Sequence, residues 1–153
     1  MHTHKIVELL RFAVIAALIV LPTRAFVAQP FLVSGNSMFP TFKNNDYLIV
    51  DELSFRFRAV ERGEIVVFRS QVEPRKHLIK RITGLPGETV EGIMLGANEY
   101  FVEGDNARES FDSRYWGALP RENITGRALL RLWPPSGISF LPGATTTPTS
   151  PTP

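Results

Sequence analysis

The chain contains no cysteine, and its three histidines are His2, His4 and His77. The absence of cysteine excludes disulfides, thiolate nucleophiles and cysteine-ligated metal ions. Because two of the histidines lie at the extreme N-terminus, a Ser-His-Asp triad and a multi-histidine metal site are disfavoured as well. The sequence therefore implies neither a metal ion nor an organic cofactor.

An excess of one charge is also missing. Lysine and arginine total 17 and aspartate and glutamate total 15 in a chain of 153 residues, which leaves a net charge of +2. These charges form no basic stripe of the kind that a nucleic-acid-binding surface needs, so we expect no nucleic-acid partner. The length suits one domain with a hydrophobic core and is too short for two domains of ordinary size.

Long hydrophobic runs are scarce, and the one apolar segment lies at the N-terminus. Residues 6–28 are largely apolar but include Glu8, Arg11 and Arg24, and the uninterrupted part, residues 12–22, has the length of the hydrophobic region of a cleaved signal peptide. The residues that follow stay apolar, without the polar start of a mature protein. We therefore favour an uncleaved transmembrane anchor over residues 1–29, with its N-terminus inside and the lipid bilayer as a partner.

Beyond residue 30 the sequence alternates between short β-type runs and turns. The expected strands are residues 47–51, 64–69, 78–83, 89–95, 99–103 and 126–133. Because no long segment has the 3.6-residue period of a helix, this pattern predicts an all-β domain over residues 30–140. Residues 53–62 fit either a strand edge or a loop on the membrane surface, and the Thr/Pro-rich residues 141–153 predict a disordered tail.

The segment Ser34–Thr41 predicts a tight turn that exposes one hydroxyl group, that of Ser37. Gly35 and Asn36 tolerate the positive φ that such turns need, and Pro40 stiffens the chain after the serine. A serine in such a turn commonly serves the turn alone. A catalytic interpretation therefore depends on what the rest of the chain brings to Ser37.

Lys80 is a candidate partner for that serine. Side chains alternate along a strand, so Lys80 shares a face with Leu78 and Ile82, whereas Arg81 points the other way. A lysine between apolar neighbours is desolvated, which lowers its pKa and lets the neutral amine act as a general base toward a hydroxyl group. The alternative is a surface lysine on an edge strand.

A polar segment, residues 104–117, is the third candidate element. Its side chains of Ser110, Asp112 and Arg114 alternate along one side of an expected extended stretch, and the Ser110 hydroxyl is suited to orient the Lys80 amine. Two arginines and two aspartates offer ion pairs in more than one combination: Arg81, Arg114, Asp105 and Asp112. The alternative is a solvated polar loop.

Together these segments resemble the type I signal peptidases. The blocks that carry the resemblance, in the order and spacing of that family, are the apolar N-terminal segment, Ser34–Thr41, Arg62–Phe68, Lys80–Glu88, Gly104–Arg114 and the closing segment Leu119–Ala128. The resemblance covers residues 5–133. It implies a β-fold serine protease at the outer face of the cytoplasmic membrane, which removes signal peptides from exported preproteins after a small-x-small motif.

The resemblance also implies roles for individual residues. Ser37 is the expected nucleophile and Lys80 the expected general base, with Ser110 orienting the lysine. Asp112 and Arg114 brace the loop. The expected walls of the pockets for small substrate side chains are Phe31, Val33, Met38 and Ile79.

The chain departs from the family pattern in three places. Many members carry serine where this chain has Gly35, which leaves oxyanion stabilisation to the Ser37 backbone N–H with Ser34 or water. Ala107 and Arg108 replace the arginine and polar residue common after Gly-Asp-Asn. The short interval between Lys80 and Gly104 leaves no room for the accessory domain of some members, so a minimal catalytic core is expected.

Two other classes of protein remain as alternatives. The self-cleaving repressors share a Ser/Lys dyad, but they carry a DNA-binding domain where this chain has an apolar segment. A membrane-anchored scaffold that binds peptides without cutting them is mildly favoured by Gly35 and opposed by the intact Ser37 and Lys80. Five aromatic residues fit either a lipid-interface surface or the core: Phe31, Phe39, Phe42, Trp116 and Trp133.

Overall fold

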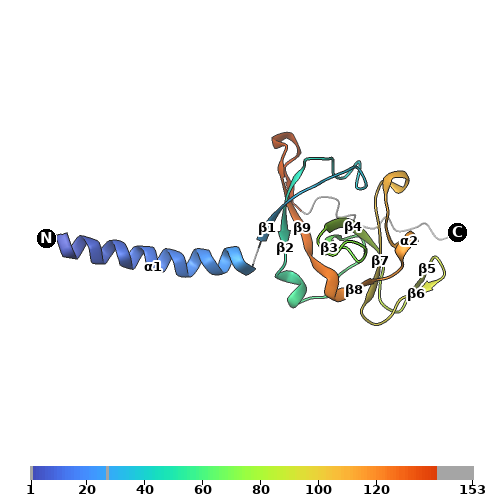
Figure 1. Cartoon of the computed structure of the whole chain (residues 1–153), viewed down its shortest axis with the longest axis horizontal. Coiled ribbons are helices and arrows are strands. Elements are labelled where there is room, and N and C mark those ends of the chain that lie inside the picture. Colours follow the sequence, from blue (N-terminus) through green and yellow to red (C-terminus); the bar gives the residue numbers. More distant parts are fainter. Residues whose placement is uncertain (1, 27, 141–153) are drawn as a thin grey trace.

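A computed structural model describes residues 2–26 and 28–140. One long helix, α1 (His2–Phe26), precedes a β-rich domain and extends away from it (Figure 1). In the described residues, no helix combines the length and apolarity needed to cross a membrane. The N-terminal helix is thus present, but its prediction as a transmembrane anchor is not supported, since Lys5, Glu8 and Arg11 interrupt its apolar sequence.

The domain is built on one antiparallel sheet. Its strands are β1 (Ala28–Leu32), β2 (Tyr47–Asp51), β3 (Ile65–Arg69), β4 (His77–Gly84), β7 (Glu99–Glu103), β8 (Leu119–Pro120), β9 (Ile124–Trp133) and β10 (Ser139–Phe140). They follow the order β1-β2-β9-β3-β4-β7-β8, and β10 pairs with β9. This architecture confirms the prediction of a mainly β domain, and it joins segments far apart in the sequence (Figure 1).

The remaining elements are short. A separate hairpin consists of β5 (Thr89–Val90) and β6 (Ile93–Met94), and α2 spans Ser113–Trp116. Single turns of 3-10 helix cover Ser54–Arg56, Ala107–Glu109, Arg121–Asn123 and Pro135–Gly137. The first of these falls in residues 53–62, the segment that the sequence left open.

Most expected strands are confirmed, and two differences have local causes. The strand predicted at residues 89–95 is wrong, because Glu91 and Gly92 adopt positive φ values of 52° and 78° and turn the chain into the β5–β6 hairpin. Strand β1 was not predicted. It contains Pro30, which has no N–H for a sheet, and its position at the sheet edge accommodates that residue.

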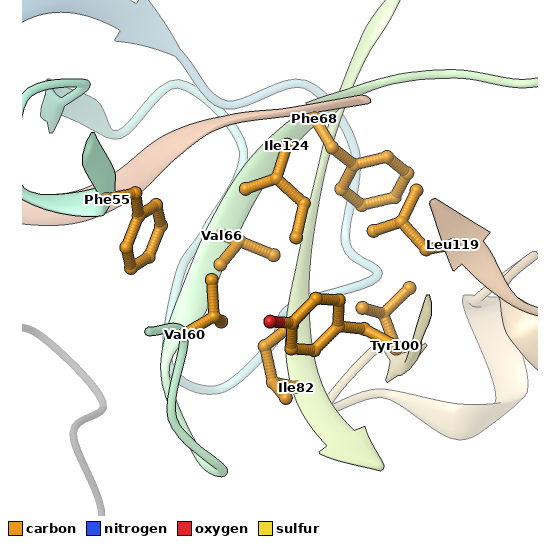
Figure 2. Packing of buried hydrophobic residues seen from close by; sticks show 9 residues of the cluster. Phe55, Val60, Val66, Phe68, Ile82, Tyr100, Leu119 and Ile124 are labelled. Carbon is orange, nitrogen blue, oxygen red and sulfur yellow. The ribbon is translucent and has the colours of Figure 1, made fainter. Parts of the chain in front are cut away.

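Two buried clusters hold the sheet together. The first packs side chains of several strands and connecting segments against one another (Figure 2): Phe55, Val60, Val66, Phe68, Ile82, Tyr100, Val102, Leu119 and Ile124. The second lies at the segment that carries Ser37: Val33, Met38, Phe42, Leu48, Ile65 and Ala128. The sequence that surrounds Ser37 is therefore attached to the core on both sides of the serine.

The aromatic residues for which the sequence left two environments open differ in burial. Phe42 is fully buried, and Trp116 packs on Phe68 with ring centroids 6.0 Å apart. Phe39 and Trp133 are about half exposed, at 48% and 55%. The expected tail, residues 141–153, lies outside the described residues.

Candidate active site

The Ser37 turn is fixed by its glycine and by the core beneath it. Gly35 adopts a φ of 92°, which favours glycine, and its N–H donates to Oδ1 of Asn44 at 2.9 Å. Met38 and Phe42 are 1% and 0% exposed. Because the residues after Ser37 are anchored in the core, its half-buried hydroxyl group has a defined position at the surface.

Lys80 on β4 meets this hydroxyl group directly. Its Nζ lies 2.6 Å from Oγ of Ser37, within hydrogen-bond distance, although the two residues are 43 positions apart in the chain. The lysine is 3% exposed. Burial lowers the pKa of Lys80 from 10.5 to about 8, an effect that the carboxylates of Asp112 and Asp105 partly offset. Lys80 therefore lies on the buried face of its strand, as the alternation of side chains predicts.

Arg81 lies on the other face of β4 and is fully paired. Its Nε and Nη2 each lie 2.7 Å from an oxygen of Asp105, and its Nη1 donates to the carbonyl oxygen of Gly63 at 2.8 Å. The Thr41 hydroxyl also donates to Asp105, at 2.5 Å. Since Thr41 ends the Ser37 turn, this ion pair connects that turn to the strand that carries Lys80.

Asp112 is the centre of a second ion pair. It is fully buried and accepts hydrogen bonds from Nε and Nη2 of Arg114, the Ser110 hydroxyl and the Gly104 N–H. Burial alone would raise the pKa of Asp112, but these donors outweigh it and lower the pKa to about 2. Of the pairings that the sequence left open, the structure contains Arg81 with Asp105 and Arg114 with Asp112.

Two expectations about this loop need correction. Ser110 donates to Oδ2 of Asp112 at 2.5 Å, and in the described part of the chain no hydrogen bond joins Ser110 to Lys80. The expected extended stretch ends at Asp112, which accepts the N–H of Arg114 and begins α2. Asp112 is both a cap and an ion-pair partner, which the alternating pattern did not reveal.

Gly104 brings the loop into contact with the turn. A Cβ atom at this position would lie 2.5 Å from the Ser37 carbonyl oxygen and would clash with the Ser110 hydroxyl. The Asn106 N–H donates to the same Ser37 oxygen at 2.9 Å. The loop thus packs directly on the backbone of Ser37, and a glycine is what permits this approach.

A pocket of about 90 Å³ opens beside the Ser37–Lys80 pair. Its walls are Phe31, Leu32, Val33, Ser34, Ser37, Leu48, Val67, His77, Leu78, Ile79 and Lys80. Three of the four expected wall residues are among them. Met38 is not, because its side chain is buried in the core cluster.

Several wall residues were not expected from the sequence, and strand register accounts for two of them. Leu48 is the cross-strand partner of Phe31, and Val67 is the partner of Ile79. His77 was missed as well, and its ring packs edge-on against Phe31 with centroids 5.5 Å apart. Pairing of the expected strands in register would have identified Val67, whereas Leu48 depends on the unpredicted strand β1.

Comparison of the sequence with known proteins identifies the family of this chain. Residues 6–95 and 92–133 match the family described as "Signal peptidase, peptidase S26". The chain belongs to the S26 signal peptidase family. This confirms the resemblance drawn from the sequence and the prediction of a serine-type signal peptidase.

Relatives in this family come from bacteria and from an animal mitochondrion. The chain is 37% identical to "Probable signal peptidase I-2" of Synechocystis, over 88% of this chain and 76% of the relative. It is 36% identical to "Signal peptidase I" of Leptolyngbya laminosa, over 78% and 76%. It is 35% identical to "Mitochondrial inner membrane protease subunit 1" of Mus musculus, over 76% of each chain.

The geometry of this site brings the side chains of Ser37 and Lys80 together. Among residues 2–26 and 28–140, no group of three or more histidine, aspartate or glutamate side chains is arranged to hold a metal ion. Ser37 supplies a hydroxyl group and Lys80 a buried amine with a lowered pKa. A buried amine in hydrogen-bond contact with a hydroxyl group is suited to accept its proton.

Proposed function

We propose that this chain removes signal peptides from exported preproteins with Ser37 as nucleophile and neutral Lys80 as general base. Membership of the S26 family supports signal-peptide removal by a serine peptidase. The observation that carries the assignment of the two residues is the 2.6 Å contact between Nζ of Lys80 and Oγ of Ser37. The lowered pKa of Lys80 makes its neutral form accessible at neutral to mildly alkaline pH.

In the proposed reaction, Lys80 Nζ takes the proton of the Ser37 hydroxyl as Oγ attacks the scissile carbonyl carbon. The tetrahedral intermediate collapses when the C–N bond breaks, and the ammonium group of Lys80 returns the proton to the leaving amine. Lys80 then removes a proton from water, which attacks the Ser37 ester. Collapse of that second intermediate releases the cleaved signal peptide and restores the Ser37 hydroxyl.

The Ser37 backbone N–H is the proposed oxyanion donor. In the described part of the chain no hydrogen bond uses this N–H, whereas the neighbouring Gly35 N–H is engaged by Asn44. Ser34 lies in the wall of the same pocket and is suited to assist. The absence of a hydroxyl at Gly35 is thereby compatible with catalysis.

The pocket supports the proposed preference for small side chains on both sides of one variable residue. Its walls are mostly apolar and close to Ser37, so a large side chain would have to displace packed atoms. Phe31, Val33 and Ile79 are the proposed substrate contacts, and Met38 acts from beneath as part of the core. We assign Ser110, Asp112 and Arg114 to bracing the loop against Ser37, with Ser110 acting through Asp112.

The proposed place of action is the outer face of the cytoplasmic membrane, where preproteins emerge. The name of the mouse relative includes an inner membrane. The described part of α1 exposes eight large apolar side chains on several sides of the helix: Ile6, Val7, Leu9, Leu10, Phe12, Val14, Ile15 and Leu18. These side chains support contact with lipid. Flotation of the full chain with phospholipid vesicles tests that contact, and a chain that stays at the bottom of the gradient argues against it.

The decisive experiment is cleavage of a preprotein with an Ala-x-Ala site in detergent micelles, with wild type compared with Ser37→Ala. We expect cleavage after the second alanine by the wild type and none by the variant. Mass spectrometry of the products gives the cut position. If neither protein cleaves and both are folded, the proposal fails and a non-cleaving peptide-binding role gains support.

A further inference from the structure

We propose that Glu109 determines specificity on the mature side of the cut, by favouring basic over acidic residues just after the scissile bond. This inference rests on the proposed function and extends it to the part of the substrate that leaves the enzyme as mature protein. It is carried by three observations: the position of the pocket, the tethering of Glu109 and the pairing of the surrounding charges.

The first observation is that the pocket lies on one side of Ser37. The segments that form its walls, residues 31–34 and 77–80 with Leu48 and Val67, include no residue of the 104–114 loop. A substrate whose residues before the cut fill this pocket therefore leads its first mature residues away from it. The path that we infer for these residues runs along the Ser37 turn and the loop packed on it.

The second observation is that Glu109 is tethered at this place. Nδ2 of Asn36, the residue before Ser37, donates to Oε2 of Glu109 at 3.2 Å. Asn106 in turn donates from its side chain to the Asn36 carbonyl oxygen at 3.2 Å and from its N–H to the Ser37 carbonyl oxygen at 2.9 Å. An exposed carboxylate is thus held next to the residue that precedes the nucleophile.

The third observation is that the other acidic side chains in and next to the loop have cationic partners. Asp105 pairs with Arg81, and Asp112 and Glu103 pair with Arg114. Across the described ranges, no ion pair involves Glu109. Glu109 is therefore the acidic side chain of the loop whose charge no ion pair of the described residues neutralises, so it is available to interact with a charged substrate.

Arg108 is the neighbouring side chain of opposite charge. It is also exposed, and both residues belong to the 3-10 turn Ala107–Glu109. Successive side chains of a 3-10 helix point about 120° apart, so Arg108 and Glu109 face different directions. The contact with Asn36 fixes Glu109 as the one directed at the Ser37 turn.

The test uses three preproteins that differ only in the first two residues after an Ala-x-Ala site: Lys-Lys, Gln-Gln and Glu-Glu. We expect the wild type to show a kcat/KM about 3- to 10-fold higher for Lys-Lys than for Glu-Glu at low salt, as exposed charge pairs contribute modestly. Glu109→Gln keeps an acceptor for Asn36 but removes the charge, so this ratio falls to about 1. Glu109→Lys inverts it, and salt at about 0.5 M weakens the wild-type preference.

Arg108→Gln is the matched control, because it removes an equally exposed charge from the adjacent position. We expect it to leave the Lys-Lys to Glu-Glu ratio at its wild-type value. Comparison of ratios cancels any change in overall activity. A ratio near 1 in the wild type, the same ratio in Glu109→Gln as in the wild type, or a shift in Arg108→Gln alone overturns the inference while the proposed function stands. Absence of cleavage of all three preproteins by the wild type overturns both.

Discussion

Lys80 and Arg81 are neighbours on β4, and their side chains lie in opposite electrostatic surroundings. The Lys80 amine is 3% exposed and contacts an uncharged hydroxyl group, with no carboxylate within ion-pair distance in the described residues. The Arg81 guanidinium makes two 2.7 Å contacts to one carboxylate. One face of the strand therefore buries a cation without an ion-pair partner in the described part of the chain, and the other face pairs a cation with a carboxylate.

This difference shows how one strand supplies both a candidate base, Lys80, and a structural ion pair, that of Arg81. Burial without a counter-charge destabilises the ammonium form and lowers the pKa of Lys80, which produces a base. Burial with a bidentate partner keeps Arg81 charged and fixes the distance between β4 and the loop at Asp105. The following experiments exchange or remove these properties one at a time.

The largest expected effect is that of Lys80→Met on cleavage. The variant keeps an unbranched apolar side chain in the buried site but removes the amine, so we expect kcat/KM to fall by about 10³-fold or more. Cleavage of the Ala-x-Ala preprotein gives the rate, and circular dichroism with thermal melting shows that the variant is folded. Substantial residual activity in the folded variant would remove lysine from the mechanism.

The pH dependence of cleavage is the next largest effect. The base must be neutral to act, and burial places the pKa of Lys80 at about 8, so kcat/KM should drop about tenfold per pH unit below pH 8 and level off above it. Since histidine also titrates near neutral pH, His77→Gln provides the control. An apparent midpoint that moves in His77→Gln would assign the titration to His77 and contradict the assignment to Lys80.

On the Arg81 side the expected effect is on stability. Arg81→Met leaves the largely buried Asp105 carboxylate without its cation, which we expect to lower the free energy of unfolding by about 2 kcal/mol. Urea denaturation measures the change. Arg81→Lys keeps the charge but loses the bidentate geometry, so about half of the loss is expected. If Arg81→Met unfolds at the same urea concentration as wild type, Arg81 is not a brace.

Residue patterns were sufficient to predict the faces of this strand, but not every contact around it. Alternation along residues 78–83 placed Lys80 among apolar neighbours and Arg81 opposite, because a strand has a strict two-residue period. The choice between Asp105 and Asp112 as partner of Arg81 depends on how a loop folds back, and no local pattern contains that information. For the same reason Ser110 was assigned to Lys80, whereas its hydroxyl donates to Asp112.

The pocket walls and the sheet edge also depend on contacts between distant segments, which local residue patterns do not predict. Phe31 and Ile79 were predicted as pocket walls, but Leu48 and Val67 follow from the pairing of β1 with β2 and of β3 with β4. Strand β1 was missed because its residues, which include Pro30, continue an apolar segment. Strand pairing over long sequence distances decides these positions.

The smallest expected effect is a change in the free energy of unfolding that has opposite signs on the two faces of β4. Lys80→Met should stabilise the protein at pH 7, whereas Arg81→Met should destabilise it. The native pKa of Lys80, about 8, lies below its ordinary value of 10.5, so at pH 7 folding carries a cost of about 3 kcal/mol for holding the ammonium group in the core. Methionine removes that cost but loses the hydrogen bond to Ser37, so we expect a net gain of about 1 kcal/mol.

Between pH 8 and pH 10.5 the unfolded chain binds more protons at this lysine than the native protein does, so wild-type stability should rise with pH across that window. The advantage of Lys80→Met should therefore shrink over the same range, as measured by urea denaturation at pH 7, 9 and 10.5. An advantage that stays constant with pH would mean that methionine stabilises by packing alone. Lys80 would then not be a strained cation at neutral pH, and its contrast with Arg81 would lose its physical basis.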